Sequence, residues 1–285
     1  MTTAPAPKPL AFDALLSRSW ALFKGNWIVA LPPFIAAAAA MVVLIVLVIV
    51  CVTAAIAHGN PEHWSGGFIA TLVGAYLLFI VFVIVATLWA SVAMYGMADA
   101  AWERGVATLG DGMAAFGARA GATFVASIGY FGLAILALIL LLPTLGLSVL
   151  VLPFATMYAL PAVVSGGRGG FEAIGESFHL VRDFFGPSAI VYLVLYAIAY
   201  GISLLMICAI IPLEFATIPL SSDTTFRMPS IPLLGFSGAL YVVTVVALIA
   251  YNGFHTIALV GMYRDLIAQP SRRALPPAGG AMLQP

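Results

Sequence analysis

Long apolar runs constrain the fold of this chain more than any other feature of its sequence. The runs cover residues 28–57, 68–98, 123–164, 187–212 and 233–263. A helix that crosses a bilayer needs about 20 mainly apolar residues, so each run is long enough to span it. Charged residues make up only 8% of the sequence, whereas soluble domains carry about 25%. The sequence therefore predicts an all-α integral membrane protein.

The third run is about twice as long as one transmembrane helix requires. The segment Pro143-Thr144-Leu145-Gly146 at its middle is a turn signal, so we expect a tight hairpin of two helices, 123–142 and 147–164. With the other four runs, this hairpin gives six transmembrane helices. Pro153 and Pro161 fall inside the fourth helix, where we expect kinks. The membrane domain would cover residues 11–268, between two tails, 1–10 and 269–285, that we expect to be disordered.

Basic residues near the ends of the runs predict the orientation, because loops rich in Lys and Arg stay in the cytoplasm. With six spans, Arg227 is the single basic residue on one side of the membrane. Ten basic residues fall on the other side, namely Lys8, Arg18, Lys24, Arg104, Arg119, Arg168, Arg182, Arg264, Arg272 and Arg273. Both termini are therefore predicted to be cytoplasmic.

Similar segments precede the first, third and fifth predicted helices. When residues 12–27 and 171–185 are aligned, three positions coincide: Trp20 with Phe178, Lys24 with Arg182, and Trp27 with Phe185. The middle copy is degenerate and keeps Asp111, Met113, Phe116 and Arg119. An even number of spans in each copy makes the copies parallel. The sequence thus predicts three parallel repeats, about 11–100, 108–165 and 171–266, each with an amphipathic elbow helix and a helical hairpin.

The elbow segments have helical periodicity, with aromatic residues along one face and a basic residue near the end. Such a helix suits the membrane interface, where aromatic rings lie at headgroup level and cations stay on the cytoplasmic side. The candidate lipid contacts, with anionic headgroups as the expected partners, are Trp20, Lys24, Trp27, Arg119, Phe178 and Arg182. In the alternative interpretation, these segments are cytoplasmic extensions of the three helices.

Several motifs resemble those of a known family. They are SRSWALFKGNW at 17–27, YALPAVV at 158–164, GGFEAI at 169–174, ESFHLVR at 176–182 and GMYRDL at 261–266. Over nearly its whole length, the chain resembles the prokaryotic six-helix membrane domain found in some glycerophosphoryl diester phosphodiesterases. The resemblance implies a multi-pass protein of the prokaryotic cytoplasmic (inner) membrane. In those enzymes a separate soluble barrel with a His-Arg pair performs catalysis. This chain has no His-Arg dipeptide, so the activity does not transfer.

Asn252 and His255 are the most informative polar pair inside a predicted span. They lie three residues apart, so they share a helix face. Polar and ionisable residues inside a membrane are rare and often functional. His and Asn also serve as hydrogen-bond partners between transmembrane helices. Two interpretations therefore stay open, a contact with a ligand or proton and a packing hydrogen bond.

No set of acids, bases or metal ligands converges in the sequence. The spans hold no Asp, Glu, Lys or Arg near their centres, although proton relays usually need buried carboxylates. His58, Glu62 and His63 share one short loop without a defined ligand geometry. We therefore expect no catalytic site, no metal site and no cofactor. The zero net charge also predicts no nucleic-acid partner.

Two hypotheses for the function follow. The first is a non-enzymatic membrane protein that acts as a scaffold, as a partner subunit of another membrane protein, or as a lipid-interacting factor. The alternative is a transporter or permease-like protein for a small apolar or amphipathic solute, with Asn252 and His255 as polar contacts. A water-accessible cavity beside His255 would favour transport, whereas a dry, packed pair would favour a scaffold.

Overall fold

The computed structural model describes residues 11–59, 65–217 and 231–269, and all regular structure within these ranges is helical. The helices are α1 (Phe12–Gly25), the 3-10 helix η1 (Trp27–Ala30), α2 (Leu31–His58), α3 (Gly66–Arg104), α4 (Leu109–Ile139), α5 (Leu147–Ala155), α6 (Ala159–Val164), α7 (Gly170–Asp183), α8 (Phe185–Thr217) and α9 (Ile231–Ile267). The predicted tail 1–10, all but the first residue of the predicted tail 269–285, and residues 60–64 and 218–230 between predicted spans lie outside the described residues. So do Lys8, Glu62, His63, Arg227, Arg272 and Arg273.

Six helical stretches in the described ranges are long and apolar enough to cross a membrane, which confirms the predicted number. They are Trp27–Ala57, Gly66–Arg104, Leu109–Ile139, Leu147–Val164, Phe185–Cys208 and Gly235–Ile267. The third apolar run divides at the predicted turn, where Leu145 and Gly146 have positive φ angles of 50° and 86°. Gly146 adopts this left-handed conformation without strain because it has no Cβ. The chain is therefore a multi-pass, all-helical protein.

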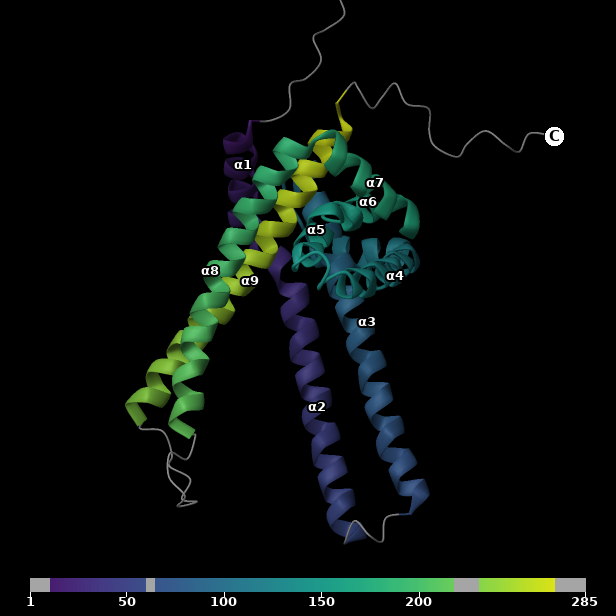
Figure 1. The fold of residues 1–285 in the computed structure, drawn as a ribbon, viewed down its shortest axis with the longest axis vertical. Coiled ribbons are helices and arrows are strands. Elements are labelled where there is room, and N and C mark those ends of the chain that lie inside the picture. The colour runs from purple at the N-terminus through teal and green to yellow at the C-terminus, as the bar shows by residue number, and fades with distance from the viewer. Residues whose placement is uncertain (1–10, 60–64, 218–230, 270–285) are drawn as a thin grey trace, which may run out of the picture.

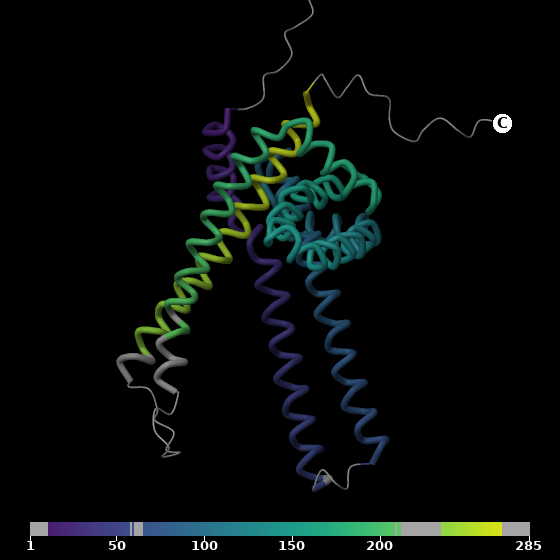
Figure 2. Tube along the Cα trace, in the orientation of Figure 1, coloured from purple at the N-terminus to yellow at the C-terminus, as the bar shows by residue number. Residues whose placement is uncertain are grey.

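The two ends of the molecule differ in how the helices are arranged (Figure 1). α2 packs with α3 and α8 packs with α9, and these two long pairs diverge towards the bottom of the view. α4, α5, α6 and α7 gather in the upper part, and α1 packs against α9 there. Figure 2 shows that the purple start and the yellow end of the described chain lie at this same end. We call it the terminal end, and we call the opposite end, where α3 and α9 begin, the loop end.

The buried core lies at the terminal end. One cluster of buried side chains joins α6, α7 and α9, and a second joins α1, α3 and α9. Tyr158, Leu180 and Tyr263 are among the largest side chains that are fully buried. The core therefore coincides with the part of the molecule where most helices meet.

α4 crosses α3 instead of running back along it. Ala93 of α3 lies against Gly112 of α4, and Gly96 lies against Ala115. The small residues let the two backbones approach closely. The crossing keeps α4 at the terminal end rather than beside α3 along its full length (Figure 1).

Two of the three predicted elbow segments are separate helices. α1 and α7 each have 14 residues, and each ends at a residue with similar non-helical angles, Asn26 (φ −134°, ψ 41°) and Phe184 (φ −124°, ψ 46°). Asn26 interrupts its helix because its side-chain amide donates to the Leu22 carbonyl oxygen at 3.0 Å. The middle segment has no such break, and α4 is continuous through Arg119. There the structure corresponds to a helix extension and not to an elbow.

Candidate binding pocket

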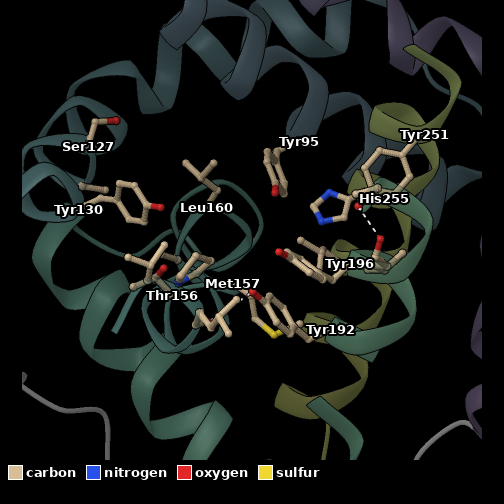
Figure 3. Close-up of a pocket in the computed structure, with 18 residues that line it drawn as sticks. Tyr95, Ser127, Tyr130, Thr156, Met157, Leu160, Tyr192, Tyr196, Tyr251 and His255 are labelled. Atoms are coloured by element: carbon tan, nitrogen blue, oxygen red, sulfur yellow. Dashed lines mark hydrogen bonds between the residues drawn. The ribbon is translucent and has the colours of Figure 1, made fainter. Parts of the chain in front are cut away.

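A pocket of about 560 Å³ lies between the middle helices and the α8–α9 pair. Six helices, α3, α4, α5, α6, α8 and α9, supply its lining together with the α5–α6 junction. Among these residues are Tyr95 from α3, Tyr130 from α4, Met157 from the junction, Tyr196 from α8 and His255 from α9 (Figure 3). The pocket is therefore a product of the tertiary fold, because its residues are far apart in the sequence. Most of the remaining lining side chains are aliphatic, so the walls are largely apolar.

The α5–α6 junction forms one wall, and Pro161 accounts for its shape. A proline lacks the N–H that would bond the carbonyl four residues earlier, and its ring displaces that carbonyl. The helix is accordingly interrupted over residues 156–158, just where Met157 lies four residues before Pro161. This interruption brings Thr156 and Met157 to the pocket. Pro153, the other predicted kink, lies inside α5.

Ser177 of α7 satisfies backbone groups that the interruption frees. Its hydroxyl donates to the Ala155 carbonyl oxygen at 2.8 Å and accepts from the Tyr158 N–H at 3.0 Å. The Tyr158 hydroxyl in turn donates to Ser188 Oγ of α8 at 3.0 Å. Because Ser177 and Tyr158 are fully buried, these bonds are shielded from solvent. α7 and α8 thus hold the pocket wall in place from behind.

Four of the polar side chains that line the pocket already have partners. Tyr251 donates to the Leu195 carbonyl oxygen at 3.0 Å, and Tyr192 donates to the Leu150 carbonyl oxygen at 3.4 Å. Thr156 and Ser127 donate to carbonyl oxygens one turn earlier in the chain, at 2.8 and 2.9 Å. The hydroxyl hydrogens of these four groups are therefore already used in hydrogen bonds to the backbone.

Four other polar side chains in the lining form no hydrogen bond within the described residues, namely Tyr95, Tyr130, Tyr196 and His255. Tyr95 is only 6% exposed, whereas Tyr130 and Tyr196 are 43% and 45% exposed. Tyr95 therefore lies in the interior, and the other two phenols lie nearer the outer surface. In Figure 3 the Tyr95, Tyr130 and Tyr196 hydroxyls point into the pocket that the His255 ring also lines.

The pocket lining contains no Asp, Glu, Lys or Arg. In addition, no group of three or more His, Cys, Asp or Glu side chains within the described ranges is placed to hold a metal ion. The chemistry that the lining offers is hydrogen bonding from neutral groups, together with apolar contact. Such a set of groups can bind and orient a molecule with an apolar body and a polar group.

The structure separates the predicted pair Asn252 and His255. His255 lines the pocket, but Asn252 does not. The neighbour of His255 on the pocket side is Tyr251, whose ring centroid lies 5.4 Å from that of the imidazole. On a helix of 3.6 residues per turn, positions four apart are closer in angle than positions three apart. A functional role for Asn252 and His255 as a pair stays a prediction, with only His255 at the pocket.

The pocket tyrosines are site residues that sequence reasoning missed. A signal for them exists in the spacing, because Tyr192 and Tyr196 lie four residues apart, as do Tyr251 and His255. Each pair places two polar tips on one helix face inside an apolar span. Tyrosines in membrane proteins are expected mainly at the interfaces, so such pairs within a span are informative.

The predicted lipid contacts on α1 and α7 lie on the surface of the terminal end. Trp20, Lys24 and Trp27 are exposed around the end of α1. Phe178 is exposed on α7, and the Arg182 side chain is 74% exposed beside Asp183 at 3.3 Å. Trp20 also packs edge-on against Phe254 of α9, with ring centroids 5.8 Å apart.

Arg119, the candidate lipid contact of the middle segment, has a different setting. It is half-buried on α4, and its guanidinium group lies against Gly167 in the turn before α7. Gly167 has a φ of +69°, and a Cβ there would lie 3.0 Å from an Arg119 nitrogen. Arg119 therefore packs against the protein and does not share the open setting of Lys24 and Arg182.

Ion pairs fix the turn between α6 and α7. Arg168 lies 3.0 Å from Glu172 and 2.5 Å from Glu176. Partial burial disfavours the charge on Arg168, but the two carboxylates outweigh it and raise the pKa of the guanidinium group above its usual value. Glu176 also accepts a hydrogen bond from the Tyr263 hydroxyl of α9 at 3.1 Å. These contacts join α7 to the end of α9.

Comparison of the chain with family models, with curated proteins and with solved structures finds no match.

Proposed function

We propose that this protein is a non-enzymatic, lipid-interacting membrane protein that binds a small amphipathic molecule in its pocket. The observation that carries the proposal is a pocket of about 560 Å³ with apolar walls and four polar side chains without partners in the described residues. Small-molecule sites are typically pockets of about 300–1,000 Å³ with apolar walls and a few convergent polar groups. Apolar walls select a hydrophobic body, and the polar side chains select at least one polar group.

The surroundings of the pocket support entry of the ligand from the bilayer. Tyr130 and Tyr196 line the pocket and are partly exposed on the outer surface. Val149 and Leu150 line it too, and each is 47% exposed. These residues lie within predicted spans, so the solvent at this surface is lipid. A molecule that partitions into lipid could therefore reach the pocket laterally.

Photolabelling with benzophenone tests the pocket. Benzophenone is a compact neutral ketone, and on illumination it reacts with nearby C–H bonds, preferentially those beside sulfur, such as those of Met157. Protein in lipid nanodiscs should show saturable labelling of the peptide that contains Met157, measured by mass spectrometry. Labelling that rises linearly with probe concentration, without saturation, would contradict the proposal.

α8 offers a matched pair of variants for this test. Ala199 lines the pocket, whereas Ala197 is exposed on the same helix and does not. Ala199→Trp should fill the pocket and abolish saturable labelling, because the added indole occupies the space of the ligand. Ala197→Trp should label like the unmodified protein. Equal labelling of the two variants would place the reaction on the lipid-facing surface and count against the pocket.

The lipid-interacting part of the proposal concerns anionic headgroups at the terminal end. Its support is the exposure of Trp20, Lys24, Phe178 and Arg182 on α1 and α7. Aromatic rings and cations with this exposure suit the headgroup region. Replacing all four by Ala should weaken co-purification of phosphatidylglycerol from mixed nanodiscs. Unchanged phosphatidylglycerol retention would remove this part of the proposal.

A permease-like role is the second candidate function, and the cavity beside His255 favours it. A neutral amphipath such as 1-decanoylglycerol is a suitable solute, because albumin can extract it from the outer leaflet of proteoliposomes. Protein-dependent transfer between leaflets should fall in a His255→Ala, Asn252→Ala double variant that still folds. Full transfer by that variant would remove the permease-like role.

The finer architecture also belongs to the proposal. We place the terminal end in the cytoplasm of a prokaryotic cell and the chain in its cytoplasmic membrane. We also retain three parallel repeats, the middle one without a separate elbow helix, and the resemblance to the phosphodiesterase membrane domain. The equal lengths and similar ends of α1 and α7 support two of the repeats. In a variant without Cys51 and Cys208, a membrane-impermeant maleimide should label Lys24→Cys from the cytoplasmic side and Gly66→Cys from the outside.

A further inference from the structure

Tyr95 is the polar group of the pocket with the least access to solvent. It is 6% exposed, its hydroxyl points into the pocket (Figure 3), and it forms no hydrogen bond within the described residues. The hydroxyl is not one of the fully buried, unpaired polar atoms of the described residues, so it is open to the pocket. An unmet donor aimed into a cavity points to a ligand that supplies the acceptor.

His255 lines the same pocket as Tyr95 and is oriented by the fold. Its ring contacts Tyr251, with 5.4 Å between the ring centroids, and Tyr251 is itself fixed by its hydrogen bond to the Leu195 carbonyl oxygen. Like the Tyr95 hydroxyl, the imidazole forms no hydrogen bond within the described residues. A neutral imidazole offers one N–H donor and one acceptor. The inner end of the pocket therefore presents two donors to a ligand.

The charge of the lining decides the charge of the ligand. Every polar side chain that lines the pocket is a neutral hydroxyl or the imidazole, and no carboxylate, ammonium or guanidinium group is among them. Burial of an ionised group without a countercharge is strongly unfavourable. A neutral ligand avoids that cost. A carbonyl oxygen is a neutral group that accepts two hydrogen bonds and offers no competing donor.

We infer that the pocket binds a neutral carbonyl compound with an apolar ring or chain, whose carbonyl oxygen accepts hydrogen bonds from Tyr95 and His255. The inference rests on the proposed binding function and names its ligand class. The apolar body extends along Leu195 and Leu259 towards the outer surface, where Tyr130 and Tyr196 lie. The ligand thus enters from the bilayer with its carbonyl group first.

A panel of compounds with one common body tests this inference on the unmodified protein. Benzophenone is the neutral ketone, diphenylmethane lacks the carbonyl group, 4-benzoylbenzoate adds a negative charge and 4-(trimethylammoniomethyl)benzophenone adds a positive charge. Each is measured as a competitor of saturable benzophenone labelling in nanodiscs, at its measured concentration in the lipid. Benzophenone should compete about tenfold better than diphenylmethane, as expected for one buried hydrogen bond. Both charged analogues should compete at least tenfold more weakly than benzophenone.

Tyr95→Phe removes the inner hydroxyl and keeps the ring. It should weaken benzophenone binding about tenfold and leave diphenylmethane binding unchanged. Tyr200→Phe is the matched control, since Tyr200 is exposed on α8 and lies outside the pocket lining. The control should bind both compounds like the unmodified protein. The competitor panel requires no variant, so it decides the question even when Tyr95→Phe does not fold.

The outcomes separate the inference from the proposed function. Equal competition by diphenylmethane and benzophenone, or tighter binding of a charged analogue, overturns the carbonyl assignment while the pocket remains a binding site. Unchanged benzophenone affinity in a folded Tyr95→Phe variant overturns it as well. Absence of saturable binding by every member of the panel overturns both the inference and the proposed function.

Discussion

The two ends of α3 lie in very different surroundings, although both are rich in apolar residues. Towards the loop end, Leu78 is 72% exposed and its neighbours are mostly exposed Val, Ile and Leu. Towards the terminal end, Met97 is fully buried and Ala93 and Gly96 lie against α4. α9 shows the same contrast, with Val242 exposed and Val260 buried. A single helix therefore presents exposed apolar side chains at its loop end and packs against other helices at its terminal end.

This contrast shows what holds the bundle together. In lipid, burying an apolar side chain against another helix brings little hydrophobic gain, so close packing and hydrogen bonds decide where helices associate. The terminal end has both features, namely glycines at helix contacts and buried side chains that bond to the backbone. The loop-end halves of α3 and α9 are dominated by large side chains that face outward. We expect substitutions at the terminal end to be costly and equivalent ones at the loop end to be tolerated.

Gly170 is the position at the terminal end where we expect a substitution to have the largest effect. A Cβ there would lie 2.6 Å from the Ala122 carbonyl oxygen and 2.6 Å from the Ala126 nitrogen, which are backbone atoms of α4. Gly170→Leu should prevent α7 from docking and yield no monodisperse protein. Gly170→Ala should fold and lose about 3 kcal/mol of unfolding free energy. Size-exclusion chromatography and Trp-fluorescence unfolding in detergent measure the two effects.

Gly74, near the loop end of α3, provides the control. A Cβ at this position would meet nothing within 4 Å. Gly74→Leu should therefore be monodisperse, and Gly74→Ala should gain up to about 1 kcal/mol because Ala is the better helix former. If Gly170→Ala is as stable as Gly74→Ala, the two ends are equally tolerant and the comparison is wrong.

Asn26 tests the hydrogen-bonded part of the comparison. Its side-chain amide donates to the Leu22 and Gly105 carbonyl oxygens at 3.0 Å each, and its oxygen accepts from the Ala107 N–H at 2.7 Å. Asn26→Ala should lose about 2–3 kcal/mol because it leaves buried backbone groups without partners. The control is Thr71→Ala, which removes an exposed hydroxyl at the loop end and should change stability by less than about 0.5 kcal/mol. Similar losses from the two variants would contradict the prediction.

Ser177 and Ser203 allow the same side chain to be compared in the buried core and on an exposed helix surface. Ser177 satisfies the Ala155 carbonyl and the Tyr158 N–H in the core, whereas the Ser203 hydroxyl bonds within its own exposed helix turn. Ser177→Ala should lose about 2 kcal/mol in thermal unfolding, and Ser203→Ala should lose almost nothing. Since Ser177 supports the pocket wall, its variant should also weaken benzophenone labelling. If Ser177→Ala changes neither thermal stability nor labelling, the α5–α6 interruption does not depend on the Ser177 hydrogen bonds.

The sequence predicted the spans because transmembrane length and apolar composition are local properties. The turn at Gly146 and the interruption before Pro161 were predictable for the same reason, since each depends on one residue and its neighbours in the chain. The crossing of α3 and α4 was not predictable in this way. It depends on small residues such as Gly96 and Ala115 that meet across two helices, and each helix contains several other small residues that make no such contact.

The pocket was predictable only at His255, which stood out as an ionisable residue in an apolar span. Tyr95 gave no comparable signal, because a tyrosine near the end of a span also fits the interfacial aromatic belt. Its burial results from the contacts that α3 makes at the terminal end. The same limit explains Arg119, whose charge suggested a headgroup contact while the fold places it against Gly167.

Arg264 gives the smallest expected effect and tests whether exposed charges contribute to the difference between the ends. It joins α9 to α3 through Glu103 at 2.5 Å and through the Asp99 carbonyl oxygen at 3.2 Å, with the Arg264 side chain 30% exposed. Arg264→Gln should lose about 1 kcal/mol at low salt, and the loss should shrink at high salt because partly exposed ion pairs are screened. Arg182→Gln is the control, because the Arg182 side chain is far more exposed and pairs with its chain neighbour Asp183. A loss for Arg264→Gln that is independent of salt would assign its role to Asp99, through the backbone hydrogen bond and the less exposed carboxylate 3.6 Å from Arg264 Nε. Exposed charges would then not contribute to the difference between the ends.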